Sequence, residues 1–380
     1  MSDPTIGIIT ALPEEFVAAE AILENATEDN IPGRGAGRQY TVGDVTSKKG
    51  GVHRVALALA PEMGNNSAAS RATLLLEHYQ TIESIIMVGI AGGVPYPEKP
   101  AEHVRLGDIV VSNEYGVIQY DYTKETAKGV ELRPFPRPPS APLREATRFM
   151  VVGELKGGRP WLDHIQQICD RLQWSRPPES TDLLVSSQDE TVVIPHPADP
   201  RRVAGQPRVF YGSIASANTL LKNPGKRDDL LRDQLHAKAF EMEGSGVADA
   251  AWEYEVGYLV IRGICDYGDS RKNDDWHCYA AAVAAGYARA LLESIPGTSN
   301  QETEQKASRI EKPAPHGTAA QSADLDSIRR QLDESRRNLI FIEERKAQYV
   351  LSVDVPLQLV KEEARLRAKI AELEKSTEVT

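Results

Sequence analysis

The chain has 380 residues, enough for a core of about 250 residues and an additional segment. Its 41% hydrophobic and 26% charged residues are typical of a soluble globular protein and exclude wholesale disorder. A net charge of −11 and a pI near 5.4 argue against a nucleic acid partner, because nucleic-acid affinity depends on a positive surface.

The predicted elements begin with an apolar strand at Ile6–Ile9 and a turn that enters a helix at Pro13. Further apolar runs alternate with helical patterns along the chain. The expected strands are 55–59, 85–88, 109–111, 209–214 and 258–261, and the expected helices are 68–79, 228–236, 244–253 and 279–292. This alternation predicts an α/β domain over residues 1–295, with a central sheet covered on both faces.

The composition changes after this domain. Residues 296–323 are polar and rich in Gln, Glu, Ser and Pro, which is typical of a flexible linker. Apolar residues then recur at helical spacing on both sides of Pro356, which predicts a helical hairpin over 324–376. The hairpin is either an inert clasp on the main domain or an oligomerisation or docking element, because two helices alone bury little surface.

Other features exclude several classes of protein. No apolar run approaches the roughly 18 residues of a membrane span, and the N-terminus lacks a secretory pattern, so we expect no membrane partner. Three cysteines without a CxxC pair favour a cytoplasmic protein. The histidines lack metal-ligand spacing, so we expect no metal, and we expect no cofactor.

Four motifs carry candidate chemistry. Asp266 follows the strand 258–261 at the edge where α/β sheets place ligands. Glu241, Met242 and Glu243 open the helix at 244. Glu15 stands in the first turn after the N-terminal strand, and Val88–Gly93 is rich in glycine.

In this order, together with Arg105–Ser112, these motifs resemble the purine nucleoside phosphorylase and nucleosidase superfamily, in particular methylthioadenosine/adenosylhomocysteine nucleosidases. The resemblance implies a three-layer nucleoside phosphorylase-like α/β domain with a central mixed sheet, followed here by the C-terminal α-helical hairpin. It implies hydrolysis of an N-glycosidic bond, with Asp266 as the acid at the purine N7 and Glu15 as the base that activates water. It also implies that Glu243 binds the ribose hydroxyls, and that Met242, Glu241, Ile90, Ala91 and Gly92 line the nucleoside site.

Departures from the family pattern refine the prediction. Met87 and Ile90 replace the phosphate-binding Arg and Ser of phosphorolytic relatives, and Glu14 and Glu15 would repel phosphate, so hydrolysis is favoured over phosphorolysis. The aromatic residue that commonly stacks on adenine is Leu220 here, followed by Leu221. We therefore expect Trp276, after a loop containing Lys272, to close the site; a core position for this Trp is an equal alternative.

Basic loops on this acidic chain suggest a nucleotide substrate. The candidate phosphate-binding residues are Arg34, Arg38, Arg137, Lys222 and Arg271. Together with the hairpin, this layout resembles the ATP nucleosidase domains of fungal and bacterial immune effectors, which cleave ATP to adenine and ribose 5-triphosphate.

Two alternatives remain open. The substrate could be methylthioadenosine or adenosylhomocysteine, or the domain could be a non-catalytic nucleotide sensor or scaffold. A pure binder would gain nothing from an acid, a base and a sugar-binding carboxylate in one cleft, which speaks against the second alternative. By resemblance we also expect a homo-oligomer, either a dimer or a hexamer.

Overall fold

In the computed structural model of the protein, residues 3–32, 37–127, 129–133, 136–271 and 273–297 are described. Beyond them, the description covers residues 332, 336, 339, 342, 363–367, 370, 371 and 374. The chain separates into a unit of residues 1–303 and a unit of residues 304–380.

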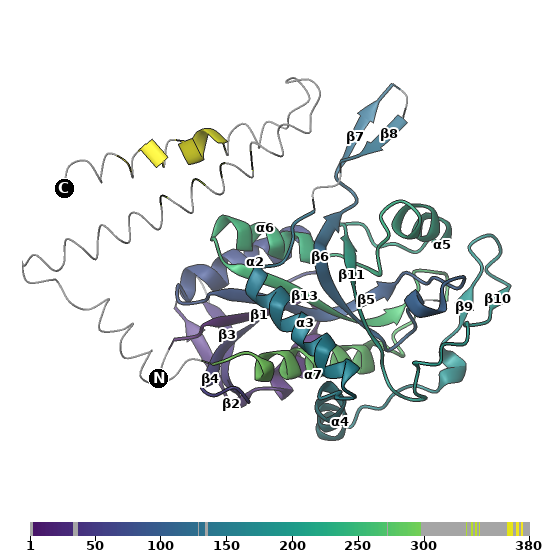
Figure 1. The fold of residues 1–380 in the computed structure, drawn as a ribbon, viewed down its shortest axis with the longest axis horizontal. Helices are drawn as coiled ribbons and strands as arrows, with labels where there is room; N and C mark the ends of the chain where they lie inside the picture. The colour runs from purple at the N-terminus through teal and green to yellow at the C-terminus, as the bar shows by residue number, and fades with distance from the viewer. Residues whose placement is uncertain are drawn as a thin grey trace, which may run out of the picture. The chain divides into compact units, whose positions relative to one another are not determined.

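The first unit is built on a mixed sheet whose strand order is β12-β11-β6-β13-β5-β1-β4-β3-β2 (Figure 1). The short strand β12 also pairs with β5, so that β12, β11, β6, β13 and β5 close into a ring. The strands are β1 (Ile6–Thr10), β2 (Glu24–Ile31), β3 (Arg38–Thr46), β4 (Val52–Leu59), β5 (Ser84–Gly93), β6 (Ile109–Gln119), β11 (Val209–Ser216), β12 (Ala239–Glu241) and β13 (Gly257–Asp266).

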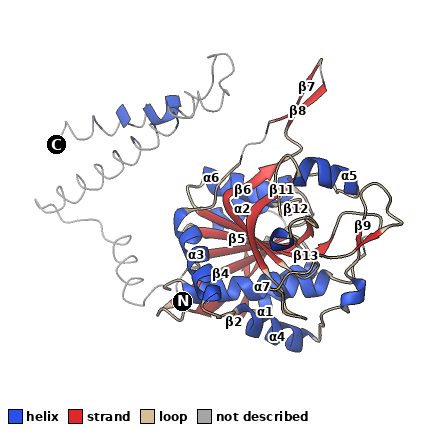
Figure 2. Ribbon diagram, turned by 45° about the vertical axis from the view of Figure 1, so that its right-hand side comes forward, coloured by secondary structure: helices blue, strands red, loops and turns tan. Residues whose placement is uncertain are grey.

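Helices cover both faces of this sheet, as predicted. Figure 2 shows α2 (Asn65–His78) and α6 (Gly244–Glu253) on one face, and α1 (Pro13–Ala21), α4 (Trp161–Leu172) and α7 (His277–Ser294) on the other. The sheet is therefore the middle of three layers. Strand β5 is buried along nearly its whole length because it lies between these two helical layers.

Parallel pairing places the ends of three central strands at one edge. β5 is parallel to β1 and to β13, and β12 meets the end of β5 where Phe240 pairs with Gly92. The carboxyl ends of β1, β5 and β13 therefore lie close to the end of β12. This edge is where α/β folds bind ligands.

Several elements differ from the sequence prediction. The strands β2 and β3, the helix α3 (Ala141–Leu155), and the projecting hairpin of β7 (Thr123–Thr126) and β8 (Gly129–Leu132) were not predicted (Figure 1). β2 and the hairpin are largely exposed, so they lack the apolar period that marks a buried strand.

The helix expected at 228–236 begins and ends earlier. It consists of α5 (Pro224–Lys226), followed by the wider π-helical turns of residues Arg227–Arg232. Asn223 begins it by accepting a hydrogen bond of 2.9 Å from the backbone amide of Lys226. His236, with a φ of 51°, cannot continue a right-handed helix.

In the second unit, helices are predicted before and after Pro356, and the described residues on both sides of it are helical. Leu366 packs against Ile342, and Arg336 pairs with Glu374 at 2.7 Å, so the two stretches lie side by side as the hairpin prediction requires. The predicted linker 296–323 falls almost entirely outside the described residues. Within the described residues, we find no helix that combines the length and apolar character of a membrane span.

Candidate functional site

Glu15 is held in place by backbone amides from the turn after β1 and from β5. Its Oε2 accepts hydrogen bonds from the amides of Ala11 (2.7 Å) and Leu12 (3.0 Å), which link β1 to α1. Its Oε1 accepts a hydrogen bond of 2.7 Å from the amide of Ile90 on β5. The side chain is buried, and this burial raises the pKa of Glu15, although nearby Arg262 and the three amides oppose the rise. Glu15 is therefore a rigid carboxylate that takes up a proton more readily than an exposed one.

Arg262 is the cation at the centre of the site. It lies on β13 and is fully buried, with Nη1 3.8 Å from Oε1 of Glu15 and Nη2 3.3 Å from Oε2 of Glu243. Its Nη2 also forms an ion pair with Glu241. One guanidinium thus joins three of the predicted site carboxylates. Sequence analysis missed this residue, although a single arginine in a buried strand is a signal because it must have carboxylate partners.

Gly89 makes room for this cluster. It pairs with Arg262 across β5 and β13, and a Cβ atom at this position would collide with Nη1 of Arg262 and with Oε1 of Glu15. The glycine is therefore required for close approach of the two charged groups, and not for an unusual backbone conformation.

The Glu-Met-Glu motif lies at the end of β12 and the start of α6. Oε2 of Glu241 accepts hydrogen bonds from the amides of Glu243 (3.0 Å) and Gly244 (2.7 Å), which fixes the helix start. Oε1 of Glu243 accepts a hydrogen bond of 3.0 Å from the amide of Gly64. Met242, between the two acids, is half-buried.

The charge state of Glu243 depends on this environment. Burial raises the pKa of Glu243 to about 7; Arg262 opposes the rise, whereas the charges of Glu241 and Glu15 add to it. Near neutral pH the carboxyl is therefore divided between its charged and neutral forms. A buried carboxyl group whose pKa is shifted by burial and by specific charge partners is a candidate for function.

Asp266 ends β13, paired with Gly92 of β5. Its Oδ1 accepts a hydrogen bond of 2.7 Å from the amide of Gly268, and the thiol of Cys265 donates to its Oδ2 at 3.3 Å. The side chain is buried. Asp266 thus lies four residues beyond Arg262 on the same strand, at the edge that also carries Ile90, Ala91 and Gly92.

An aromatic side chain that sequence analysis missed lies beside Asp266. Phe240 is buried, and its ring occupies the space in front of Gly92 and Gly268, so that a Cβ atom at either glycine would collide with the ring. Leu220, at the position of the family's stacking aromatic, is 51% exposed, whereas Leu221 packs in the cluster that contains Phe240. The signal for Phe240 was its place immediately before the Glu-Met-Glu motif.

Trp276 lies in the hydrophobic core. It is 2% exposed, its indole N–H donates to Oγ1 of Thr181 at 3.1 Å, and its ring packs edge-on against Tyr279. The alternative of a core tryptophan therefore describes its position, and no closing function is needed to explain its burial.

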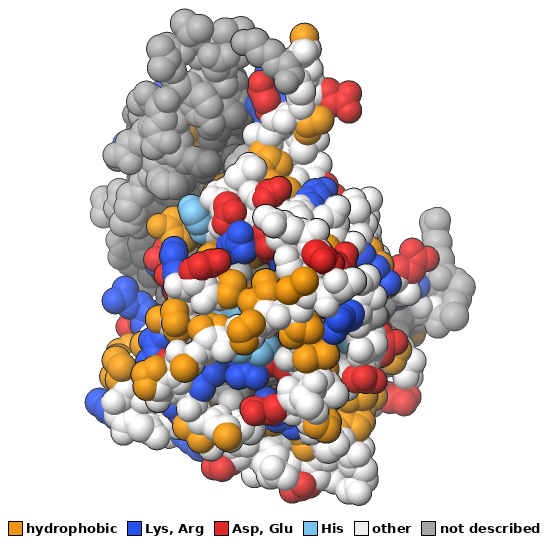
Figure 3. Space-filling model, turned by 90° about the vertical axis from the view of Figure 1, so that its right-hand side faces the viewer, with side chains coloured by type: hydrophobic (Ala, Val, Ile, Leu, Met, Phe, Trp, Pro, Cys, Tyr) orange, Lys and Arg blue, Asp and Glu red, His pale blue; other side chains and the backbone are white. Residues whose placement is uncertain are grey.

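The candidate phosphate-binding residues are dispersed. Arg137 pairs with Asp249 at 2.5 Å and stacks on Trp252. Arg38 is exposed at the start of β3, Lys222 and Arg271 are exposed on two separate loops, and Arg34 and Lys272 lie outside the described residues. On the face drawn in Figure 3, basic side chains alternate with acidic ones and form no continuous patch.

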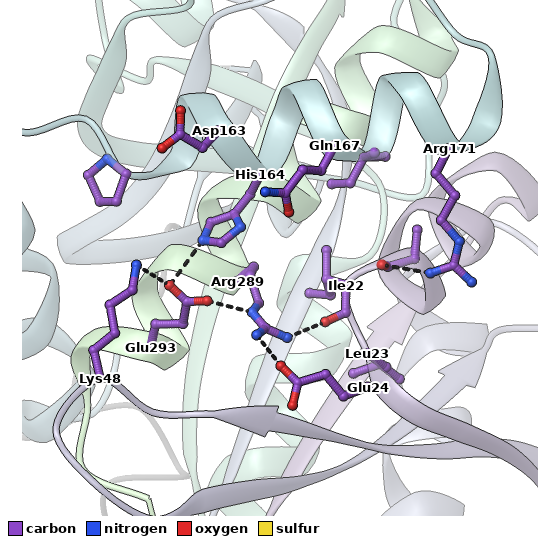
Figure 4. Close-up of a pocket in the computed structure, with 13 residues that line it drawn as sticks. Ile22, Leu23, Glu24, Lys48, Asp163, His164, Gln167, Arg171, Arg289 and Glu293 are labelled. Carbon is purple, nitrogen blue, oxygen red and sulfur yellow. Dashed lines mark hydrogen bonds and ion pairs between the residues drawn. The ribbon is translucent and has the colours of Figure 1, made fainter.

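A separate polar cleft of about 600 Å³ lies between the end of α1, α4 and α7 (Figure 4). Glu293 accepts hydrogen bonds there from Lys48 (2.6 Å), His164 (3.0 Å) and Arg289 (2.8 Å). The charges of the lining balance, because the cations Lys48, Arg171 and Arg289 face the anions Glu24, Asp163 and Glu293, and no residue of the acidic cluster lines the cleft. The cleft is therefore distinct from the candidate site.

The domain that carries these residues matches a known protein family. Residues 5–293 match the model of the phosphorylase superfamily. The chain belongs to this superfamily. The family predicted from the sequence motifs is thereby confirmed.

Three relatives bear on the enzyme class. A nucleotide-binding leucine-rich repeat (NLR)-like protein of Hyaloscypha variabilis is 31% identical over 76% of this chain, and the chain spans 29% of that protein. The ATP nucleosidase Cap17 of Escherichia coli is 28% identical over 74% of this chain, which spans half of it. A 5'-methylthioadenosine/S-adenosylhomocysteine nucleosidase of Mycobacterium bovis is 28% identical, with 77% of this chain and 97% of the relative covered.

The fold also matches solved structures. A 5'-methylthioadenosine/S-adenosylhomocysteine nucleosidase of Borrelia burgdorferi superposes with a TM-score of 0.55 at 17% identity, covering 76% of this chain and all of the other. This likeness confirms the predicted phosphorylase-like fold. The E. coli and M. bovis relatives are nucleosidases, which confirms the predicted enzyme class.

Proposed function

We propose that this protein hydrolyses the N-glycosidic bond of an adenine nucleotide, with ATP as the preferred substrate and adenine and ribose 5-triphosphate as products. The observation that carries the proposal is the convergence of Glu15 and Glu243 on Arg262, with Asp266 at the end of the same strand. An acid, a sugar-binding carboxylate and a base are the groups that this reaction requires.

The departing base requires a proton donor and an aromatic side chain against which it can stack. In the proposed mechanism, Asp266 donates a proton to the purine N7, so that adenine leaves as a neutral molecule. The buried ring of Phe240, in front of Gly92 and Gly268, supplies an aromatic surface for adenine. The acid and the aromatic ring thus act on the same end of the substrate.

The sugar develops positive charge as the bond breaks. Ionised Glu243 accepts hydrogen bonds from the ribose hydroxyls, and its charge stabilises the cationic sugar. The amide of Gly64 and the guanidinium of Arg262 hold this carboxylate in position. Half-buried Met242 lies beside it and packs against the sugar.

Water takes the place of the base. Glu15, whose pKa is raised by burial, accepts the proton of the attacking water. Buried Met87 offers no hydrogen-bond donor to a phosphate ion, and the acidic cluster repels one. Both features favour hydrolysis over phosphorolysis.

A second candidate reaction is hydrolysis of methylthioadenosine or adenosylhomocysteine. The full-length match to the M. bovis nucleosidase supports it, as does the engagement of Arg137 by Asp249. ATP is favoured here because of the Cap17 relative and the basic loops. Both candidates use the same acid, base and sugar contacts.

A substrate panel separates the two reactions. The purified full chain is incubated with ATP, dATP, ADP, AMP, adenosine and methylthioadenosine, and adenine is quantified by chromatography. We expect the largest kcat/KM with ATP. Adenine release from methylthioadenosine but not from ATP would replace the first candidate with the second, and no release from any compound would support a non-catalytic sensor.

A further inference from the structure

A buried carboxylate outside the acidic cluster reaches the residue that follows Asp266. Asp182 comes from the segment between α4 and β11, and its side chain is fully buried. Its Oδ1 accepts a hydrogen bond of 2.7 Å from the hydroxyl of Tyr267, and its Oδ2 accepts one of 2.8 Å from Nε of Arg105. The turn after β13 is therefore tied to a distant part of the chain.

The backbone of Tyr267 is fixed as well. Its carbonyl accepts a hydrogen bond of 2.8 Å from Nη1 of Arg227, a buried arginine whose Nε donates to Asp228 at 2.7 Å. The next residue, Gly268, has a φ of 63° and donates its amide to Asp266. Both sides of the turn are thus constrained immediately beyond the acid.

Two histidines orient Asp182 in turn. The amide of Tyr96 donates to Nδ1 of His103 at 3.1 Å, so the proton of neutral His103 is assigned to Nε2. This Nε2 donates to Nδ1 of His196 at 2.8 Å, which leaves the proton of His196 on Nε2, where it donates to the carbonyl of Asp182 at 3.0 Å. Burial lowers the pKa of His103 to about 3, so this histidine stays neutral. The donor and the acceptor in each hydrogen bond from Tyr96 to Asp182 are therefore fixed.

We propose that Asp182 is a positioning residue for the acid Asp266 and acts through the hydroxyl of Tyr267. The inference rests on the proposed function, in which Asp266 protonates the purine. A general acid must lie within hydrogen-bond reach of its target, and a displacement of about 1 Å can cost on the order of 100-fold in rate. Loss of the Tyr267 hydroxyl bond removes the side-chain anchor of the turn, whereas the bond from Arg227 to its backbone and the Glu243 contact to the sugar stay in place.

The test uses two tyrosine variants of the full chain. Tyr267→Phe removes the hydroxyl that donates a hydrogen bond to Asp182. Tyr287→Phe removes an equally buried hydroxyl on α7, bonded to Tyr211 at 3.0 Å, and serves as the matched control. We expect Tyr267→Phe to lower kcat about 10- to 100-fold with KM changed less than about twofold, and Tyr287→Phe to leave both within about twofold.

A double-mutant cycle separates positioning from general stability. In an Asp266→Asn background, Tyr267→Phe should cause no further loss, because the acid that it positions is already absent. A kcat for Tyr267→Phe within twofold of wild type, or a loss no larger than that of Tyr287→Phe, would overturn the inference while leaving the proposed function intact. A wild-type protein that cleaves no adenine compound, or an Asp266→Asn variant with full activity, would instead overturn the proposed function and this inference with it.

Discussion

The guanidinium of Arg262 lies 3.3 Å from the carboxylate of Glu243 in the interior of the domain. The same group also contacts Glu241 and lies 3.8 Å from Glu15, so one positive charge serves three negative ones. Such a cluster is stable only while its cation is present, because an unpaired buried carboxylate costs several kcal/mol.

Replacing Arg262 should damage both stability and activity. Arg262→Met keeps the volume but leaves three buried carboxylates without a cation, and we expect a loss of about 3–5 kcal/mol in the free energy of unfolding. Urea unfolding measures this loss. Arg148→Met, on an exposed position of α3, is the control and should change the free energy by less than about 0.5 kcal/mol. Equal stability of the two variants would contradict the central role of Arg262.

Gly89→Ala should destabilise the protein by about 1–3 kcal/mol, because the added methyl group collides with Arg262 and Glu15. It should also reduce kcat, since both groups must move. Gly153→Ala in α3 is the matched control: its methyl group would meet nothing within 4 Å, and it should stabilise the helix by about 0.5–1 kcal/mol. Thermal unfolding and initial rates compare the pair, and unchanged activity in Gly89→Ala would argue against a closely packed site.

The pKa of Glu243 is about 7 in the folded protein and 4.5 for the ordinary group, so this carboxyl makes the free energy of unfolding depend on pH. Between these values the folded state holds a proton that the unfolded state has lost, so the free energy of unfolding should fall as pH rises from 4.5 to 7. Glu243→Gln should reduce this fall, because Gln does not titrate. Urea unfolding at several pH values tests the prediction, and an identical pH profile in the variant would contradict it.

The activity should depend on pH in the opposite direction from the stability. In the proposed mechanism Glu243 binds the ribose hydroxyls in its ionised form, so kcat/KM should rise as pH increases through about 7. Glu243→Gln should lower kcat/KM at all pH values and remove this rise. A rise that persists in Glu243→Gln would assign the ionisation to another group.

Phe240 should contribute to binding of the base. Phe240→Leu keeps an apolar side chain but removes the aromatic face, which should raise KM for the nucleotide about 3- to 10-fold, equivalent to about 0.5–1.5 kcal/mol. Phe149→Leu, at an exposed position on α3, is the control and should leave KM unchanged. A KM for Phe240→Leu equal to that of wild type would show that adenine stacks elsewhere.

The sequence predicted strands at the positions of β1, β4, β5, β6, β11 and β13, because each is a strong apolar run. It singled out Glu15, Glu243 and Asp266 because each acid stands in a local motif beside such a run, and their roles belong to the proposed mechanism. It did not predict Arg262 or Phe240 as site residues, although both lie within or next to the quoted motifs. Their importance arises from pairing between strands that are distant in the chain, as Arg262 with Gly89 and Phe240 with Gly92. Periodicity within one segment carries no such information.

The basic loops also show that local sequence does not predict contacts between residues that are distant in the chain. Arg137 was proposed for phosphate because of its charge and proline-rich surroundings, but it pairs with Asp249, more than one hundred residues further along the chain. For Trp276 the sequence leaves closure of the site and a core position as equal alternatives, and the structure engages its N–H and ring in the core with Thr181 and Tyr279. Charge and size predict what a side chain can bind, and the fold determines which partner it meets.

The most direct test of the account is a reaction of ATP in water enriched in ¹⁸O, with and without phosphate, followed by mass spectrometry of both products. We predict free adenine and a ribose 5-triphosphate that carries one ¹⁸O atom, at a rate independent of phosphate and strongly reduced in Asp266→Asn. A sugar product without ¹⁸O, formed only when phosphate is present, would contradict water as the nucleophile and hydrolysis as the reaction.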